Sequence, residues 1–149
     1  MAEEQPVALV TGARTGIGRA IAERLQQDGY RVALNVHRAL TDDEQAELGQ
    51  TFQPLTVVVG DVADEPAAEA MVSQVQDQFG RLDLLVNNAG LNRDTLLTRM
   101  KAADFEQVVH TNLTGAFLMT KYALKLMQKQ RAGNIVNISS IAGLRGNIG

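Results

Sequence analysis

The sequence predicts an α/β fold in which a doubly wound parallel sheet is covered by helices on both faces. Short apolar runs alternate with segments of helical periodicity along the chain, which is typical of parallel sheets. A glycine-rich turn joins the first apolar run to the first helical segment. The 149 residues are 45% hydrophobic, which is enough for one domain, or part of one, with a sizeable core.

The expected elements follow one another without a linker, repeat or low-complexity tract. Gly29 stands where glycine commonly ends a helix, and Pro66 suits a first helical turn. Strands are expected at 7–10, 31–36, 55–59, 82–86 and 134–138, and helices at 17–27, 42–48, 66–79 and 104–130.

The apolar residues of segment 104–130 do not keep to one stripe. Phe105, Leu113 and Met127 mark one face, and Phe117 and Leu124 widen it beyond what a surface helix needs. We therefore expect two surfaces of this helix to be covered. One would pack on the sheet, and the other on a partner subunit or on further parts of the same chain.

Composition argues against several classes of function. The net charge is −3, so no positive field favours nucleic acid or an anionic membrane. Cysteine is absent and the first residues are polar and acidic, unlike a signal peptide. No apolar run approaches the roughly 20 residues that span a bilayer. We expect a cytoplasmic protein without a catalytic metal, because no His or carboxylate cluster has metal-ligand spacing.

The glycine-rich turn carries the first chemical signal. Gly12, Gly16 and Gly18 have the spacing G-x-x-x-G-x-G, which differs from the G-x-G-x-x-G of other dinucleotide folds. Glycine is needed where a side chain would clash with a pyrophosphate, and a following helix offers unpaired N–H groups to that anion. The turn could be only a turn, but its place between a strand and a helix favours a Rossmann-like dinucleotide site.

The end of the second strand bears on which dinucleotide binds. An acidic residue there hydrogen-bonds the ribose hydroxyls of NADH and repels a 2′-phosphate. Residues 35–38 contain no acid. Arg38, with Arg14 or His37, would pair with the phosphate, so the sequence favours NADPH over NADH. The alternative is that these are solvated surface arginines.

Several motifs together resemble the short-chain dehydrogenase/reductase family. They are Thr11-Gly-x-x-x-Gly-Ile-Gly18, Asp61-Val62, Asn87-Asn-Ala-Gly90, Asn112 and Asn137-Ile-Ser-Ser-Ile-Ala-Gly143. The resemblance covers about the first three fifths of a typical member. It implies that the cofactor is held by Gly12, Arg14, Thr15, Gly16, Ile17, Gly18, Arg38, Asp61, Val62, Asn88, Ala89 and Gly90. One departure is that Thr15, not a basic residue, precedes the second glycine.

The resemblance also implies a ketone reduction by hydride transfer from the nicotinamide. Ser140 matches the serine that holds the substrate carbonyl, with Ser139 beside it, although two serines that merely end a strand are the alternative. Asn112 matches an asparagine that bends its helix and holds a water. The family's Tyr-x-x-x-Lys does not occur. We therefore expect residues 1–149 to form an incomplete NAD(P)-binding domain that is inactive alone.

Residues 93–105 are most similar to the 3-oxoacyl-[acyl-carrier-protein] reductases. Acetoacetyl-CoA reductases are the close alternative, and a non-catalytic nucleotide-binding or assembly module is the alternative of another class. Acyl carrier protein is acidic, so a basic surface would suit it. Arg131 and Lys129 are the expected contacts, with Lys121 and Lys125 in the same stripe, which is otherwise a solvated face. We also expect a homo-oligomer, since the fifth strand would form an uncovered edge.

Overall fold

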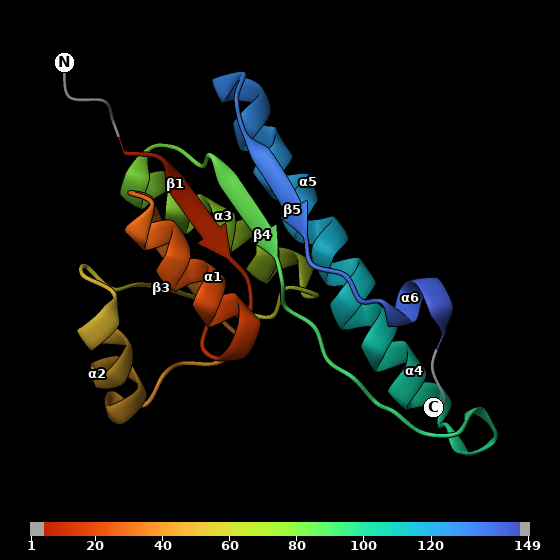
Figure 1. Cartoon of the computed structure of the whole chain (residues 1–149). Helices are drawn as coiled ribbons and strands as arrows, with labels where there is room; N and C mark the ends of the chain where they lie inside the picture. Colours follow the sequence, from red (N-terminus) through yellow and green to blue (C-terminus); the bar gives the residue numbers. More distant parts are fainter. Residues whose placement is uncertain (1–4, 147–149) are drawn as a thin grey trace.

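The computed structural model describes residues 5–146, which form one parallel sheet and its covering helices (Figure 1). The strands lie in the order β3-β2-β1-β4-β5, and each neighbouring pair is parallel. The predicted α/β class is therefore confirmed. The strands are β1 (Val7–Val10), β2 (Arg31–Val36), β3 (Thr56–Val59), β4 (Leu84–Asn87) and β5 (Asn134–Asn137).

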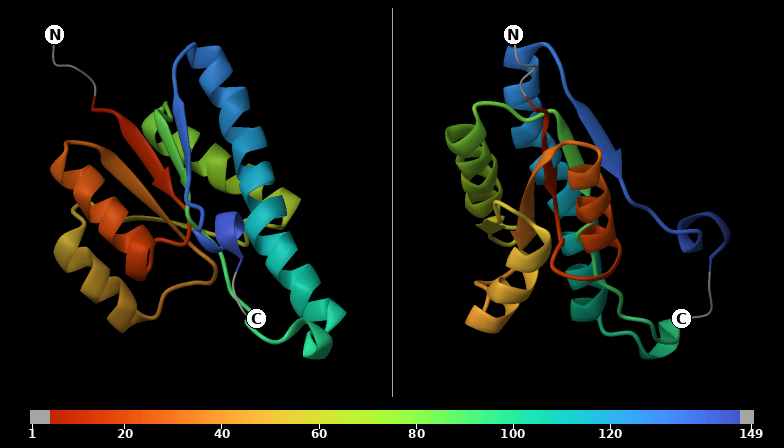
Figure 2. Two further views of the ribbon diagram at one scale, coloured as in Figure 1. Left: turned by 45° about the vertical axis from the view of Figure 1, so that its right-hand side comes forward. Right: turned by 60° about the vertical axis from the view of Figure 1, so that its left-hand side comes forward.

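Helices cover both faces of the sheet (Figure 2). On one face, Ala22 and Leu48 pack with Leu34 and Val86 of the strands. On the other, Val75 and Met119 belong to a second core that includes Leu85. The helical elements are α1 (Gly16–Gln27), α2 (Asp42–Thr51), α3 (Glu65–Phe79), the short turn η1 (Leu97–Arg99), α4 (Ala102–Val109), the π-helical turn η2 (His110–Thr114), α5 (Gly115–Gln130) and α6 (Ala142–Arg145).

The fourth strand begins at Leu84, two residues later than the sequence predicts. Leu82 is fully buried, but its backbone is taken up by a side chain rather than by the sheet. The Gln130 amide accepts from the Leu82 N–H at 2.9 Å and donates to the Leu82 carbonyl at 3.0 Å. An apolar pattern does not reveal such a side-chain partner, so the predicted strand begins two residues too early.

The segment predicted as one helix over 104–130 is helical from 102 to 130 but is not uniform. The π-helical turn η2 separates α4 from α5. Asn112 lies within it and hydrogen-bonds the backbone of Leu91, outside the helix. π-turns are rare and occur mostly as single turns inside α-helices. The structure thus has a π-turn at Asn112, the residue at which a bend is expected.

Only one of the two expected surfaces of this helix is covered within residues 5–146. Leu118, Met119 and Leu126 are buried against α3 and the sheet. In contrast, Phe105, Leu113, Phe117 and Leu124 are exposed. In the same part of the chain, no helix is long and apolar enough to cross a bilayer.

Two glycine substitutions test the packing of α5. A Cβ at Gly115 would stand 2.6 Å from Cγ2 of Val62, whereas a Cβ at Gly49, in α2, would meet nothing within 4 Å. We predict that Gly115→Ala lowers the free energy of unfolding by about 1–3 kcal/mol through overpacking. Gly49→Ala is the matched control and should raise it by up to about 1 kcal/mol. Urea denaturation measures both, and a Gly115→Ala variant as stable as the parent would contradict this packing.

Candidate active site

The sheet topology creates a crevice between the carboxyl ends of β1 and β4. The strands after β1 build outward on one side of it, whereas β4 and β5 lie on the other side. In open α/β sheets, ligands bind at this reversal of strand order. Here the glycine turn follows β1 and residues 88–90 follow β4, so both segments lie at this reversal of strand order (Figure 1).

Thr11 and Asn88 join the two sides of the crevice. The Thr11 hydroxyl accepts hydrogen bonds from the backbone N–H groups of Asn88 and Ala89, at 3.0 and 2.9 Å. In return, the Asn88 side chain donates to the carbonyls of Thr11 and Gly12, at 2.9 and 3.2 Å. These bonds fix the position of the glycine turn relative to residues 88–90.

Asn35, at the end of β2, holds the same turn from the other side. Its side-chain oxygen accepts from the Gly12 N–H at 3.1 Å, and its backbone oxygen accepts from the Ala13 N–H at 3.0 Å. Its amide donates to the Gly60 carbonyl at 3.1 Å. In the sequence this position stands out only as one without an acid. The available signal was a polar residue one position before the end of an apolar strand.

Glycine is required at two positions of the turn. Gly12 has φ +61°, and a Cβ there would lie 2.9 Å from Cα of Ala89. A Cβ at Gly18 would lie 2.4 Å from the Asn88 amide nitrogen and 2.5 Å from the Gly12 carbonyl oxygen. The glycines therefore allow the close contact between the turn and residues 88–89.

The N-terminus of α1 fits an anionic group. Thr15 occupies the cap position but makes no side-chain cap bond, and the first turn holds no acidic residue. By contrast, Thr41 caps α2 and Asp64 caps α3. A Cβ at Gly16 would meet nothing within 4 Å, and Ile17 is exposed. Uncapped helix N–H groups beside open space suit a pyrophosphate.

A cavity of about 280 Å³ lies beside the glycine turn. Five of the predicted cofactor residues line it, namely Gly12, Asp61, Val62, Ala89 and Gly90. The Asp61 carboxylate accepts from the Ala63 N–H at 2.9 Å, which orients it after β3. Asn35 and His37 also contribute to the wall. The position after β3 and the lining suit the adenine end of a dinucleotide.

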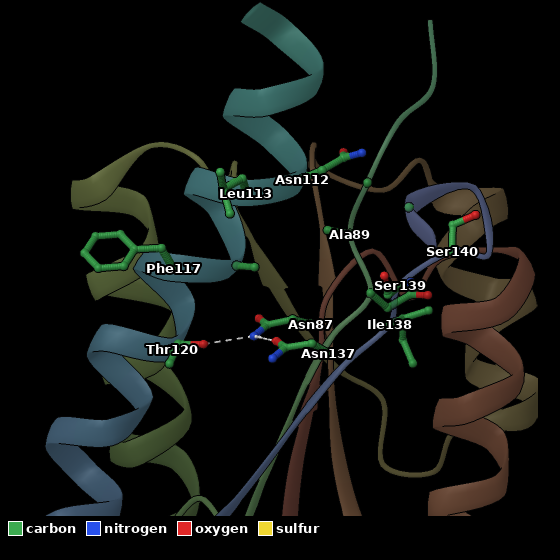
Figure 3. Close-up of a pocket in the computed structure, with 14 residues that line it drawn as sticks. Asn87, Ala89, Asn112, Leu113, Phe117, Thr120, Asn137, Ile138, Ser139 and Ser140 are labelled. Carbon is green, nitrogen blue, oxygen red and sulfur yellow. Dashed lines mark hydrogen bonds between the residues drawn. The ribbon is translucent and has the colours of Figure 1, made fainter. Parts of the chain in front are cut away.

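A second and larger cavity, of about 580 Å³, lies between the ends of β4 and β5 and the start of α5 (Figure 3). Ser139 and Ser140 line one side, while Leu113 and Phe117 come from the helix opposite. The Ser140 hydroxyl accepts from the Ala142 N–H at 3.2 Å. The two cavities share Ala89 and Gly90.

The floor of the larger cavity contains polar residues that the sequence analysis did not name as site residues. The Asn87 amide donates to the Thr120 hydroxyl at 3.0 Å and to the Asn137 side-chain oxygen at 2.8 Å (Figure 3). Asn87 and Asn137 occupy the same position in the register of β4 and β5. The position of Asn87 and Asn137 at the carboxyl ends of adjacent strands was the available signal in the sequence. Thr120 lies within a helix, and no feature of the sequence indicated that it belongs to the site.

Asn112 binds the chain that follows Gly90. Its oxygen accepts from the Leu91 N–H at 2.9 Å, and its amide donates to the Leu91 carbonyl at 3.0 Å. Asn112 also lines the larger cavity. The predicted residue therefore lies in the site, and it ties η2 to the segment after β4.

Arg14 and Arg38 lie together beside one carboxylate. Glu44, in the first turn of α2, accepts from Arg14 at 2.8 Å and from both terminal nitrogens of Arg38 at 2.9 Å. The Arg38 guanidinium is the largest cause that lowers the pKa of the Glu44 carboxyl to about 2. The arginines are therefore not simply solvated, and an acid stands between them although β2 ends without one.

The basic stripe on α5 is largely paired within the chain. Lys121 binds Glu65 of α3, and the Lys125 ammonium lies 4.0 Å from the Glu69 carboxylate. Both lysine side chains are partly exposed, and the acidic side chains of α3 lie beside them, so their positive charge is offset within the chain. The helix pairing that brings them together is tertiary, so the stripe alone did not indicate it.

Lys129 and Arg131 lie away from both cavities. They follow one another around the end of α5, immediately before β5, whereas Ser139 and Ser140 follow β5. The two pairs therefore lie at opposite ends of β5, Lys129 and Arg131 at its amino end and the serines at its carboxyl end. Elsewhere in the described residues, no group of three or more His, Asp or Glu side chains is placed to hold a metal ion.

Comparison with known proteins decides the family. A family model described as short chain dehydrogenase matches residues 6–149. The chain belongs to the short-chain dehydrogenase family. This assignment agrees with the order along the chain of the glycine turn, residues 87–90 and the two serines that line the larger cavity.

The relatives of this short-chain dehydrogenase include several that share one name. A 3-oxoacyl-[acyl-carrier-protein] reductase of Synechocystis is 46% identical over 96% of the chain. Reductases of the same name from Staphylococcus aureus and Vibrio harveyi are 43% and 42% identical over 95% and 98% of it. The chain spans 58–59% of the length of these relatives.

The bonds between Asn112 and Leu91 yield a testable prediction. Asn112→Ala should speed hydrogen exchange at the Leu91 amide and lower the free energy of unfolding by about 1–2 kcal/mol, because two backbone groups lose their partners. Amide exchange followed by NMR measures the first effect. Asn92→Ala, in the same exposed loop, is the control and should leave the Leu91 amide unchanged. Equal exchange in all three proteins would contradict this role.

The pairing of Arg38 with Glu44 also has a pH signature. The pKa of Glu44 is lowered to about 2 on folding, from 4.5. The pair therefore adds to stability above pH 4.5, and the contribution is lost as the pH falls toward 2. Arg38→Gln should raise the Glu44 midpoint toward 4.5, as followed by carboxyl NMR titration. Identical titration curves for the parent and the variant would refute the pairing.

Proposed function

We propose that this short-chain dehydrogenase serves in the NADPH-dependent reduction of 3-oxoacyl-[acyl-carrier-protein] to the 3-hydroxyacyl form. The observation that carries the proposal is the crevice between β1 and β4. The glycine turn that leads to the uncapped α1 N-terminus borders the smaller cavity there through Gly12, and this cavity shares Ala89 and Gly90 with the larger one. The names of the relatives described above support the substrate class. A cytoplasmic location stays a prediction from the sequence.

In this proposal the glycine turn holds the cofactor. Gly12, Gly16 and Gly18 leave room for the pyrophosphate at the start of α1, with Thr15 and Ile17 between them. Asp61 and Val62 border the adenine, and Arg14 and Arg38 contact the 2′-phosphate. Asn88, Ala89 and Gly90 lie along the nicotinamide side of the shared wall. When bound, NADPH supplies the hydride.

The substrate carbonyl is placed in the larger cavity. The Ser140 hydroxyl donates a hydrogen bond to the carbonyl oxygen, where negative charge develops. Asn112 holds the segment after β4 against η2 and keeps the cavity open at its helix side. Proton delivery in the family arrangement needs Tyr-x-x-x-Lys, which these 149 residues do not contain. That step therefore requires residues beyond them.

Contact with the carrier protein is the most remote part of the proposal. Lys129 and Arg131 offer positive charge to an acidic carrier, but they lie at the amino end of β5, whereas the serines follow its carboxyl end. A carrier bound there would present its acyl group to the cavity of another copy rather than of the same copy. Carrier contact at these residues thus goes together with a homo-oligomer, for which the exposed apolar residues of α4 and α5 provide surface.

Two alternatives remain distinct from this function. An acetoacetyl-CoA reductase would use the same crevice and serine but would not depend on Lys129 and Arg131. A non-catalytic nucleotide-binding or assembly role is favoured by the lack of Tyr-x-x-x-Lys in these residues. Competition between 3-oxoacyl-carrier and acetoacetyl-CoA substrates distinguishes the first alternative from the proposed function. Activity of the chain after it is joined to the remaining part of a relative distinguishes the second.

The function is tested by joining this chain to the part of the Synechocystis reductase that it does not cover. We predict that the 149-residue chain alone reduces no 3-oxoacyl substrate, whereas the joined protein oxidises NADPH when 3-oxoacyl-carrier substrate is added. Ser140→Ala should lower kcat by about 10²–10³-fold, and Ser139→Ala should have a much smaller effect. A greater loss with Ser139→Ala would contradict the assignment of Ser140. A joined protein that folds but never reduces the substrate would contradict the function.

A further inference from the structure

Glu44 is the residue that the function proposed above leaves unexplained. Its carboxylate lies between the two arginines assigned to the 2′-phosphate. Arg14 Nη1 is 2.8 Å from Oε1, and Arg38 donates in a bidentate manner, Nη1 to Oε2 and Nη2 to Oε1, both at 2.9 Å. Bidentate arginine–carboxylate pairs are among the stronger and more directional hydrogen bonds in proteins. The arginines therefore meet an anion that belongs to the chain.

The Glu44 carboxylate is held in place by the capping box of α2. Glu44 Oε2 accepts from the Thr41 N–H at 2.9 Å, and the Glu44 N–H donates to the Thr41 hydroxyl at 3.3 Å, which is a capping box. The Glu44 side chain is 19% exposed, against 45% for Arg14 and 57% for Arg38. The first turn of α2 thus places the acid, and the more exposed arginines close onto it.

We propose that Glu44 sets the cofactor preference of this chain by competing with the 2′-phosphate of NADPH for Arg14 and Arg38. The inference rests on the proposed NADPH site. Glu44 from α2 thus repels the 2′-phosphate, as an acidic residue at the end of β2 would do in an NADH-preferring site. NADPH displaces the carboxylate from the guanidinium groups, whereas NADH leaves the three side chains in place.

Charge decides the direction of the effect. The two arginines and Glu44 carry a net charge of +1, and the carboxylate repels a phosphate that approaches the same guanidinium groups. Charges a few ångströms apart interact several times more strongly near a protein surface than in bulk water, because the effective dielectric constant is lower there. Glutamine removes this repulsion but keeps an oxygen that accepts from the Thr41 N–H. Binding of NADPH should therefore tighten when Glu44 becomes glutamine.

The opposite role for Glu44 predicts the opposite result. If the carboxylate served only to hold the arginines ready for the phosphate, its removal would loosen them and weaken NADPH binding. The sign of the change in NADPH affinity separates the two roles. NADH has no 2′-phosphate, so its affinity reports any general effect on the site.

The test compares the parent chain with Glu44→Gln, using fluorescence titration with NADPH and with NADH. The expected result is about tenfold tighter binding of NADPH with NADH changed by less than about twofold. Glu47→Gln is the matched control, because Glu47 lies on the same helix and pairs with Arg19 instead. It should change neither affinity.

Three outcomes would overturn the inference. NADPH binding that is weaker or unchanged in Glu44→Gln contradicts competition while leaving the proposed function intact. Equal tightening of NADH, or the same gain in Glu47→Gln, shows a general charge effect. Failure of the parent to bind either dinucleotide contradicts the NADPH site itself, and the inference with it.

A measurement on the unmodified chain does not depend on the variant folding. If NADPH displaces Glu44, the carboxyl loses its arginine partners and its pKa rises from about 2 toward 4.5. Carboxyl NMR titration of Glu44 should show this rise with NADPH bound and not with NADH bound. The same midpoint with both cofactors would overturn the competition.

Discussion

The junction between β1 and β4 is the contact on which the rest of the site depends. Thr11 and Asn88 exchange hydrogen bonds across it in both directions, and Gly18 lies so close to Asn88 that no side chain fits there. Because these strands are neighbours at the reversal of strand order, one set of contacts fixes the turn after β1 and the segment after β4 together. The crevice thus has a defined width before any ligand enters it.

Two further residues extend this junction outward. Asn35 brings in β2 through Gly12 and β3 through Gly60, and Asn112 brings in the long helix through Leu91. Asn35 is buried and Asn112 is exposed, but both direct side-chain donors and acceptors at backbone groups that lie outside the sheet ladder and need partners. The loops at the carboxyl edge are therefore held by side chains, while the strands are held by the sheet.

Local patterns in the sequence were sufficient to predict the strands, most helix ends and the glycine turn, because those signals act within a few residues. Contacts between distant segments were not predictable in this way. The π-turn at Asn112 depends on Leu91, and the pairing of Arg14 with Glu44 spans 30 positions. The acidic partners of Lys121 and Lys125 were not predicted either, because α3, which carries them, meets α5 only in the fold.

Whether the β1–β4 junction forms a dinucleotide site can be measured by NMR titration of the isotope-labelled 149-residue chain with NADPH. We expect shifts of the backbone amides of residues 12–18, 61–62 and 88–90, with the surface between α3 and α5 unchanged. Saturable binding whose shifts fall on α3 and α5, or no shifts at the junction at all, would contradict a dinucleotide site there.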